Sequence, residues 1–247
     1  MNPTTTGVES KRSRVKGTRA PDAPLRPRLM RVFHFLNAEY GLGDIRRRRL
    51  KIAQIPDLND PFELLSIDLS NKDLRRAFQA TKEELSKTGG ILCFSKKWSN
   101  PVLWSHYADK HRGLCLGFKV PKKYLVRVSY TTERLVSEAE KLLRTGSTDE
   151  STMRRLLSTK YAHWEYEKEM RCFVSLEEKD PKSGLYFADF SDDLRLVQVI
   201  VGARSDVSRT DVAEALGPLG KSVRVFKVRL AFKSFRVVRN KDESLWV

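Results

Sequence analysis

Residues 90–118, GILCFSKKWSNPVLWSHYADKHRGLCLGF, predict a strand, a short helix and a second strand within twenty-nine residues. The apolar runs at 91–94 and 114–118 are bounded by glycine or polar residues, which is typical of strands buried on both faces. Between them, Asn100 suits an N-cap, and Pro101 suits the first helical position because its missing N–H has no intrahelical partner there. We therefore expect a compact helix beside a buried sheet edge.

The predicted helix carries aromatic and imidazole side chains. At about 100° per residue, Trp104, Tyr107 and His111 share one face. His106 lies on the same short helix, so this segment holds two of the four histidines of the chain. Such a face suits the wall of a ligand pocket. The alternative for Trp104 is a core aromatic residue that packs the helix onto its strands.

Composition places the chain among globular proteins. Its 247 residues are enough to bury a sizeable core, and 40% of them are apolar. No apolar run approaches the roughly eighteen residues of a membrane span, and the N-terminus lacks the apolar core of a secretory signal. We therefore expect a cytoplasmic protein without a membrane partner. The three cysteines match no zinc-binding spacing and sit among apolar neighbours, so we expect buried, reduced thiols and no metal site.

The formal net charge of +16 favours an anionic partner such as nucleic acid. Residues 1–29 hold seven Lys and Arg against two acidic residues, lack periodicity, and contain many Pro and small polar residues. We expect a disordered basic tail there, followed by a single domain over residues 30–247. An organelle transit peptide is an alternative for this Arg-rich, Ser/Thr-containing tail. We expect the tail to add affinity for polyanions without contributing to folding.

The rest of the chain mixes strand-like and helix-like patterns. Alternation places His34 in the middle of a first strand that begins near residue 31. The clearest helix spans residues 70–87, begins with a capping box of Ser70 and Asp73, and stops at Gly89. Further strands are expected at 50–54, 125–130, 167–174, 194–201, 223–230 and 235–238, and further helices at 135–143, 153–164 and from 208. This order favours an α+β fold of mixed, mainly antiparallel sheets with flanking helices.

A second informative stretch is WEYEKEMRCFV at residues 164–174, where helical periodicity gives way to alternation. If a strand begins near Glu167, then Glu167, Glu169 and Arg171 line the face opposite the core. A carboxylate beside aromatic surface suits stabilisation of an oxocarbenium-like centre, such as forms when a glycosidic bond to ribose breaks. The alternative is a solvated strand face with an ion pair. On an exposed face, Glu169→Gln is expected to change the free energy of unfolding by no more than about 0.5 kcal/mol.

Several catalytic motifs are absent from the sequence. It contains no Gly-rich phosphate loop, no G-x-S-x-G elbow and no H-E-x-x-H helix. A cysteine–histidine nucleophile built from Cys93 or Cys115 near His106 is disfavoured, because apolar flanks are typical of unreactive thiols.

Three ordered motifs carry a resemblance to known families. LNDPFE at 58–63, the segments CFS, LWSHYA and HRGLCLGF across 93–118, and WEYEKEMR at 164–171 together resemble the bacterial domain of unknown function DUF2971, over about residues 31–205. The layout is also similar to the ADP-ribosyltransferase superfamily. In that superfamily a first-strand His or Arg, a central-strand Ser or Tyr and a late-strand Glu surround NAD.

The second resemblance implies an ADP-ribosyltransferase-like fold, NAD as co-substrate and a set of site residues. The glutamate would hydrogen-bond the nicotinamide ribose while aromatic rings stack on nicotinamide, with Tyr107 or Tyr40 as the stacking residue. The catalytic candidates are Glu169 and Glu167, and either can be the catalytic one. The expected cofactor-binding residues are His34, Ser95, Trp104, His106, Tyr107 and Arg171.

Two functions from different classes follow. The first is an NAD-consuming ADP-ribosyltransferase or NAD glycohydrolase, by its resemblance an effector of the toxin or phage-defence kind, with nucleic acid as one acceptor. The alternative is a non-catalytic, basic nucleic-acid-binding module, which the charge of +16, the basic tail and the aromatic residues favour. The two differ in where the basic residues fall: Lys and Arg side chains around a cleft between Trp104 and Glu169 would indicate an enzyme that modifies nucleic acid, and basic residues on another face would indicate binding alone.

Overall fold

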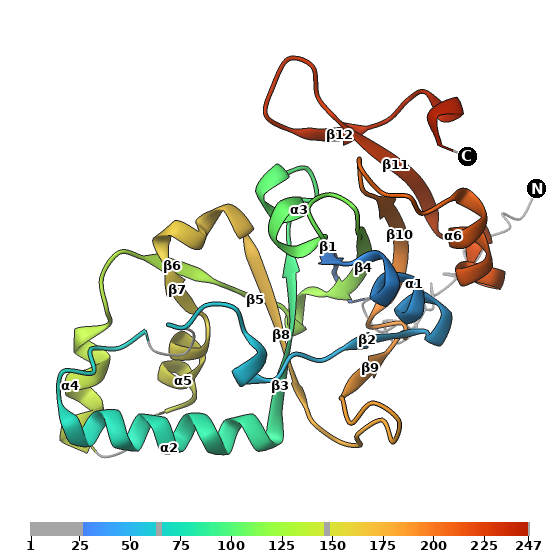
Figure 1. The fold of residues 1–247 in the computed structure, drawn as a ribbon. Coiled ribbons are helices and arrows are strands. Elements are labelled where there is room, and N and C mark those ends of the chain that lie inside the picture. The colour runs from blue at the N-terminus through green and yellow to red at the C-terminus, as the bar shows by residue number, and fades with distance from the viewer. Residues whose placement is uncertain (1–26, 63–65, 146–148, 247) are drawn as a thin grey trace, which may run out of the picture.

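The computed structural model describes residues 27–62, 66–145 and 149–246, and a curled eight-stranded sheet runs through them (Figure 1). In sheet order its strands are β12 (Val237–Arg239), β11 (Arg224–Leu230), β10 (Arg195–Val201), β4 (Leu114–Pro121), β1 (Leu29–Leu36), β3 (Gly89–Ser95), β8 (Glu169–Ser175) and β5 (Val126–Arg127). Neighbours in this order are antiparallel except β10 and β11. The mixed, mainly antiparallel architecture predicted from the sequence is therefore confirmed.

Smaller elements surround this sheet. The described helices are α1 (Ala38–Arg47), α2 (Lys72–Thr88), α3 (Pro101–Tyr107), α4 (Val136–Thr145), α5 (Glu150–Leu157) and α6 (Arg209–Leu216). Short 3₁₀ helices are η1 (Ile55–Asp57), η2 (Lys122–Tyr124), η3 (Ala162–Glu167), η4 (Gly217–Lys221) and η5 (Glu243–Leu245). Two-stranded sheets pair β2 (Arg49–Lys51) with β9 (Phe187–Asp189), antiparallel, and β6 (Ser129–Thr131) with β7 (Thr159–Tyr161), parallel.

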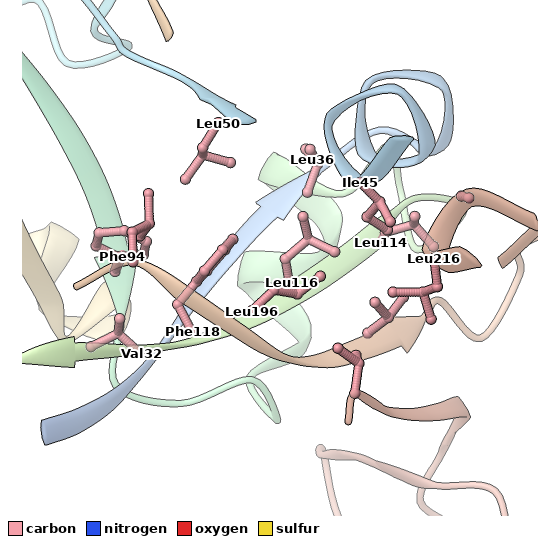
Figure 2. Close-up of a cluster of buried hydrophobic side chains, with 14 of the residues drawn as sticks. Val32, Leu36, Ile45, Leu50, Phe94, Leu114, Leu116, Phe118, Leu196 and Leu216 are labelled. Atoms are coloured by element: carbon pink, nitrogen blue, oxygen red, sulfur yellow. The ribbon is translucent and has the colours of Figure 1, made fainter. Parts of the chain in front are cut away.

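Alternation along β4 gives the sheet two buried faces. Leu116 belongs to the same buried cluster as Ile45 of α1 and Leu216 of α6 (Figure 2). Cys115, the neighbouring residue, belongs to a separate cluster with Trp104 of α3. Successive side chains of a strand point to opposite faces, so α1 and α6 cover one face and α3 covers the other. Each Leu buried in this way contributes about 1.5–3 kcal/mol to stability.

A third cluster joins α2, α4 and α5 beside the β8–β5 end of the sheet (Figure 1). The spacing of Leu74, Phe78 and Leu85 predicts the buried stripe of α2; Leu74 and Phe78 are buried, and Leu85 is half-buried. The prediction of Ser70 as the N-cap is wrong, because Asn71 caps α2. The Asn71 side chain accepts hydrogen bonds from the backbone N–H groups of Asp73 and Leu74. Amide oxygen and hydroxyl oxygen are equally good N-cap acceptors, so the pattern alone did not separate Asn71 from Ser70.

The predicted basic tail and the sheet overlap by a few residues. Residues 1–26 of the tail lie outside the described residues, as does Glu63 of the motif at 58–63. Gly146, at which the sequence predicts that the helix of residues 135–143 stops, also lies outside them. The carbonyl oxygen of Arg28 accepts a hydrogen bond from Lys122 N at 2.8 Å, and Leu29 pairs with Pro121 at the start of β1. The sheet therefore begins inside the segment predicted as tail. Within the described ranges, no helix is long and apolar enough to cross a membrane.

The turn after α3 is fixed by close approaches between backbone segments. Asp109, Lys110 and His111 all have positive φ, between 43° and 71°, which places three non-glycine residues in the left-handed region. The turn is closed by close backbone approaches. A Cβ at Gly113 would lie 2.1 Å from the carbonyl oxygen of Leu36, and a Cβ at Gly202 would lie 2.2 Å from that of His111. Gly113 thus allows the turn to pack on the end of β1, and Gly202, after β10, allows close packing on the turn itself.

We predict that Gly113→Ala lowers the free energy of unfolding by about 2 kcal/mol or more, because the added methyl group meets backbone atoms that cannot rotate away. Gly220→Ala is the matched control, since the nearest atom to its Cβ lies 3.9 Å away. Denaturant-induced unfolding of both variants measures the difference. Equal unfolding midpoints for Gly113→Ala and the wild type would contradict this packing.

Candidate functional site

The large sheet is weakly joined between β1 and β3. β3 pairs with β8 at seven successive positions and β1 pairs with β4 at eight, but β1 and β3 share one paired position, Phe33 with Ser95. Beside this position a side chain replaces the backbone pairing: His34 Nδ1 lies 2.8 Å from the carbonyl oxygen of Cys93. The His34 side chain thus takes part in joining the two parts of the sheet here.

A cavity of about 110 Å³ lies at this join. Its apolar wall includes Phe33 and Phe35 of β1 and Phe94 of β3. Its polar groups come from segments far apart in the sequence. They are His34, Asn59, Tyr107, Lys160, Glu167 and Glu169, with Ser95 at the edge of β3. The structure therefore brings His34, Ser95, Tyr107 and both glutamates of the sequence-based set to one cavity.

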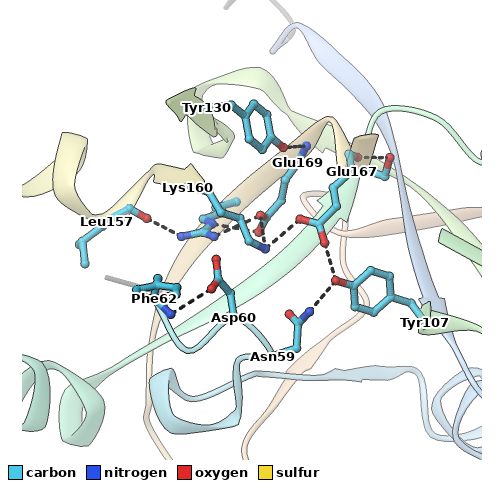
Figure 3. A network of polar contacts seen from close by, with 11 residues as sticks. Asn59, Asp60, Phe62, Tyr107, Tyr130, Leu157, Lys160, Glu167 and Glu169 are labelled. Carbon is cyan, nitrogen blue, oxygen red and sulfur yellow. Dashed lines mark hydrogen bonds and ion pairs between the residues drawn. The ribbon is translucent and has the colours of Figure 1, made fainter. Parts of the chain in front are cut away.

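Glu167 is held at the cavity by a tyrosine and a lysine (Figure 3). The Tyr107 hydroxyl donates to Glu167 Oε1 and accepts from Asn59 Nδ2 at 2.8 Å, and Lys160 Nζ donates to Glu167 Oε2 at 2.8 Å. Burial raises the pKa of Glu167 although Lys160 and Tyr107 act in the opposite direction. Burial, and then the charge of Glu167, raises the pKa of Tyr107 well above its usual range. Tyr107 therefore remains a hydrogen-bond donor, and the negative charge of Glu167 is incompletely stabilised.

Glu169 is held far more firmly. Arg171 Nε lies 2.9 Å from Glu169 Oε1 and Arg171 Nη2 lies 3.1 Å from Glu169 Oε2, a bidentate pair. Lys160 Nζ lies 3.5 Å from the same Oε2 (Figure 3). Burial alone would raise the pKa of Glu169, but Arg171 and then Lys160 outweigh it and lower this pKa. Glu169 is therefore an ionised, fixed carboxylate.

The prediction that Glu167, Glu169 and Arg171 line an exposed strand face is wrong. Glu167 ends η3, Glu169 begins β8, and Lys168 between them has φ 46° and ψ 47°. This left-handed residue breaks the strand alternation. Glu167, Glu169 and Arg171 are only 4%, 5% and 1% exposed, respectively. The expected tolerance of Glu169→Gln, which rested on exposure, does not hold.

His34 presents a neutral ring to the cavity. A carbonyl oxygen can only accept a hydrogen bond, so the contact with Cys93 O places the proton on Nδ1 and leaves Nε2 as an acceptor. Burial lowers the pKa of His34, which favours the neutral form at pH 7. His34 is thus suited to accept a hydrogen bond from a ligand hydroxyl or amide.

The hydroxyl of Ser95 is already engaged with the backbone. Ser95 Oγ donates to the carbonyl oxygen of Glu167 at 2.6 Å and accepts from Lys97 N at 3.1 Å. The side chain therefore joins the end of β3 to η3. This contact places Glu167 beside the cavity.

Three other residues of the sequence-based set do not line the cavity. Trp104 is completely buried and its Nε1 donates to Trp98 O at 2.6 Å, so its alternative as a core residue is confirmed. His106 is exposed, with its ring 6.2 Å from that of Tyr166. Arg171 lies behind Glu169, where Nη1 donates to Leu157 O at 2.7 Å. Arg171 therefore fixes a carboxylate instead of contacting a ligand.

Lys160 and Asn59 line the cavity but were not among the site residues predicted from the sequence. Lys160 falls within residues 153–164, which were predicted as helix, whereas residues 159–161 form β7. Asn59 belongs to the LNDPFE motif at 58–63, which was the available signal. Its neighbour Asp60 is 4% exposed, and its Oδ2 has no hydrogen-bond partner among the described residues. No cluster of His, Cys, Asp and Glu suited to a metal ion occurs in the described ranges.

The fold and the cavity define an α+β protein whose buried carboxylate–lysine–tyrosine cluster lies at the join of two parts of one sheet. Residues 103–172, from α3 into β8, match the family described as "Protein of unknown function (DUF2971)". This segment contains Tyr107, Lys160, Glu167 and Glu169, so the resemblance to that family is supported where the cluster lies. No curated protein and no solved structure matches the chain. The resemblance to the ADP-ribosyltransferase superfamily has no support from these comparisons.

We predict that Glu169→Gln lowers the free energy of unfolding by about 3 kcal/mol at pH 7, because it leaves Arg171 and Lys160 buried with one anion fewer. The pKa of Glu169 is lowered on folding, so its stabilisation is fully present above the ordinary value of 4.5 and is lost as the pH falls through the folded value. The difference between variant and wild type should therefore shrink below about pH 4.5.

Urea unfolding at pH 7 and at lower pH measures this difference. Glu178→Gln, at an exposed position, is the control and should change stability by no more than about 0.5 kcal/mol. A Glu169→Gln protein as stable as the control at pH 7 would show that the buried ion cluster contributes little.

Proposed function

We propose that the cavity binds the nicotinamide ribose of NAD, and that the chain breaks the bond between nicotinamide and ribose as an ADP-ribosyltransferase or NAD glycohydrolase. One arrangement carries this proposal: Glu167 and Glu169 share Lys160, but Glu169 also has the bidentate pair with Arg171, and this difference moves the pKa values of the two carboxyl groups in opposite directions. Pairs of titratable groups with pKa values driven apart are typical of active sites that separate two roles. Loss of cellular NAD would make the protein an effector of the toxin or phage-defence kind.

We assign Glu167 as the catalytic carboxylate. A positive charge developing on ribose gains most from the anion that its surroundings compensate least. Glu169 is compensated by a bidentate arginine and by Lys160, whereas Glu167 has Lys160 and a neutral hydroxyl. The positive charge of the nicotinamide ring would also favour the ionised form of Glu167. Glu169 is then a positioning residue, which holds Lys160 in place.

The reaction needs few groups from the protein. When the C–N bond breaks, its electrons leave with nicotinamide, which becomes neutral, and a cationic ribose centre develops. Water or an acceptor hydroxyl then attacks this centre and passes its proton to Glu167. His34 Nε2 is an acceptor for a ribose hydroxyl or the carboxamide N–H, and Phe35 and Phe94 supply apolar surface for the ring.

The size of the cavity limits what enters it. Pockets that enclose a drug-sized ligand measure about 300–1,000 Å³, and this cavity measures about 110 Å³. It therefore suits one end of a dinucleotide, and the adenosine half would lie outside it.

We predict that Glu167→Gln lowers the turnover number for nicotinamide release from NAD by roughly 10²–10³, the scale for removing one preorganised electrostatic group. Its unfolding free energy should change less than that of Glu169→Gln, because burial already disfavours the charge of Glu167. His106→Gln, outside the cavity, is the control and should retain full turnover.

Chromatographic measurement of nicotinamide, with and without protein and nucleic-acid acceptors, tests this. If folded wild-type protein neither releases nicotinamide nor binds NAD in calorimetry, the proposal is refuted. Equal turnover for Glu167→Gln and wild type would refute the assignment of Glu167.

A further inference from the structure

Two phenylalanine side chains stand in solvent in the loop between β11 and β12. Phe232 is 88% exposed and Phe235 is 99% exposed. The loop is closed by its own backbone: Ala231 N donates to Arg236 O and Arg236 N donates to Ser234 O, both at 2.9 Å. The loop joins β11 and β12, which pair as antiparallel strands at the edge of the sheet (Figure 1). Large apolar side chains held in water in this way are typical of interaction surfaces.

The sequence around these two rings is basic. Between residues 224 and 241 the sequence contains seven Lys and Arg and no Asp or Glu. Lys233 and Arg236 are exposed in the loop itself. The guanidinium carbon of Arg229 lies 4.2 Å from the centre of the Phe232 ring. The surface therefore complements an extended polyanion that also offers flat apolar groups.

We infer that this surface, formed by Arg229, Phe232, Lys233, Phe235 and Arg236, binds single-stranded nucleic acid. Bases stack on Phe232 and Phe235, and phosphates contact the basic side chains. Stacking of bases on aromatic rings within a basic groove is the common mode of sequence-tolerant single-strand binding. An arginine on one face of Phe232 leaves the other face for a base.

An anionic membrane fits the observations less well. Insertion of Phe232 into lipid would carry the guanidinium of Arg229 toward the hydrocarbon, which is costly for a charge.

The surface is separate from the cavity. In the sheet, β10 and β4 separate β11 from β1 and β3, which line the cavity. β12 does contact the segment before α3, where Val237 N donates to Ser99 O at 3.0 Å. Bound nucleic acid would therefore lie at the far end of the sheet from β8. Binding at this surface and chemistry at the cavity are independent inferences.

Fluorescence anisotropy with a labelled oligothymidylate tests the inference on the full chain, so that residues 1–26 contribute equally to every variant. The double variant Phe232→Ala, Phe235→Ala should bind at least about tenfold more weakly, from the loss of two stacking contacts, with an unchanged salt dependence. The double variant Lys233→Gln, Arg236→Gln should lower the slope of log K against log salt by about 1.4, which is 0.7 for each of two phosphate contacts.

Matched controls lie elsewhere on the surface. Tyr40→Ala removes an exposed ring on α1, and Lys72→Gln with Arg76→Gln removes two exposed charges on α2. Neither control should change affinity beyond a small general charge effect. Unchanged oligothymidylate binding by the phenylalanine variant overturns the inference. Phenylalanine-dependent binding to vesicles containing phosphatidylserine, without any effect on oligothymidylate, also overturns it and assigns the surface to membranes.

Discussion

The burial of Lys160 between two carboxylates is the constraint on which the site depends. Lys160 lies on β7, Glu167 ends η3 and Glu169 begins β8, and Tyr107 of α3 completes the contacts (Figure 3). Each charge loses hydration when it is buried, and this loss is offset only if the partners are all in place. Arg171 supplies the second buried cation. Separate elements are thereby held in one arrangement at the place where β1 and β3 share a single paired position.

The buried cluster places its two carboxylates in different electrostatic surroundings. Arg171 and Lys160 stabilise the charge of Glu169, which fixes the position of the ammonium. Glu167 receives less compensation, and burial raises its pKa. A cationic group placed in the cavity would supply the missing compensation. The cost of burying the charge of Glu167 therefore favours a positive charge in the cavity, and the proposed cleavage of a nicotinamide–ribose bond would use this preference.

The sequence predicts secondary structure correctly where an element is determined by its own residues. The alternation around His34 and the capped helix after Asn100 predict elements that the structure contains. The prediction failed where tertiary contacts override the pattern. Lys168 adopts a left-handed conformation that removes Glu167 from the strand, and this conformation follows from η3 and not from residue type. Lys160 was missed because its short strand follows α5 directly and shows no periodicity of its own.

The most direct measurement is a site-resolved carbon-13 NMR titration of the two carboxyl groups, assigned with the Glu167→Gln and Glu169→Gln variants. We expect a pKa for Glu167 above the ordinary value of 4.5 and a pKa for Glu169 below it. Addition of NAD should then lower the pKa of Glu167 and leave that of Glu169 nearly unchanged. Two carboxyl groups that both titrate near 4.5, or in the reverse order, would contradict this expectation.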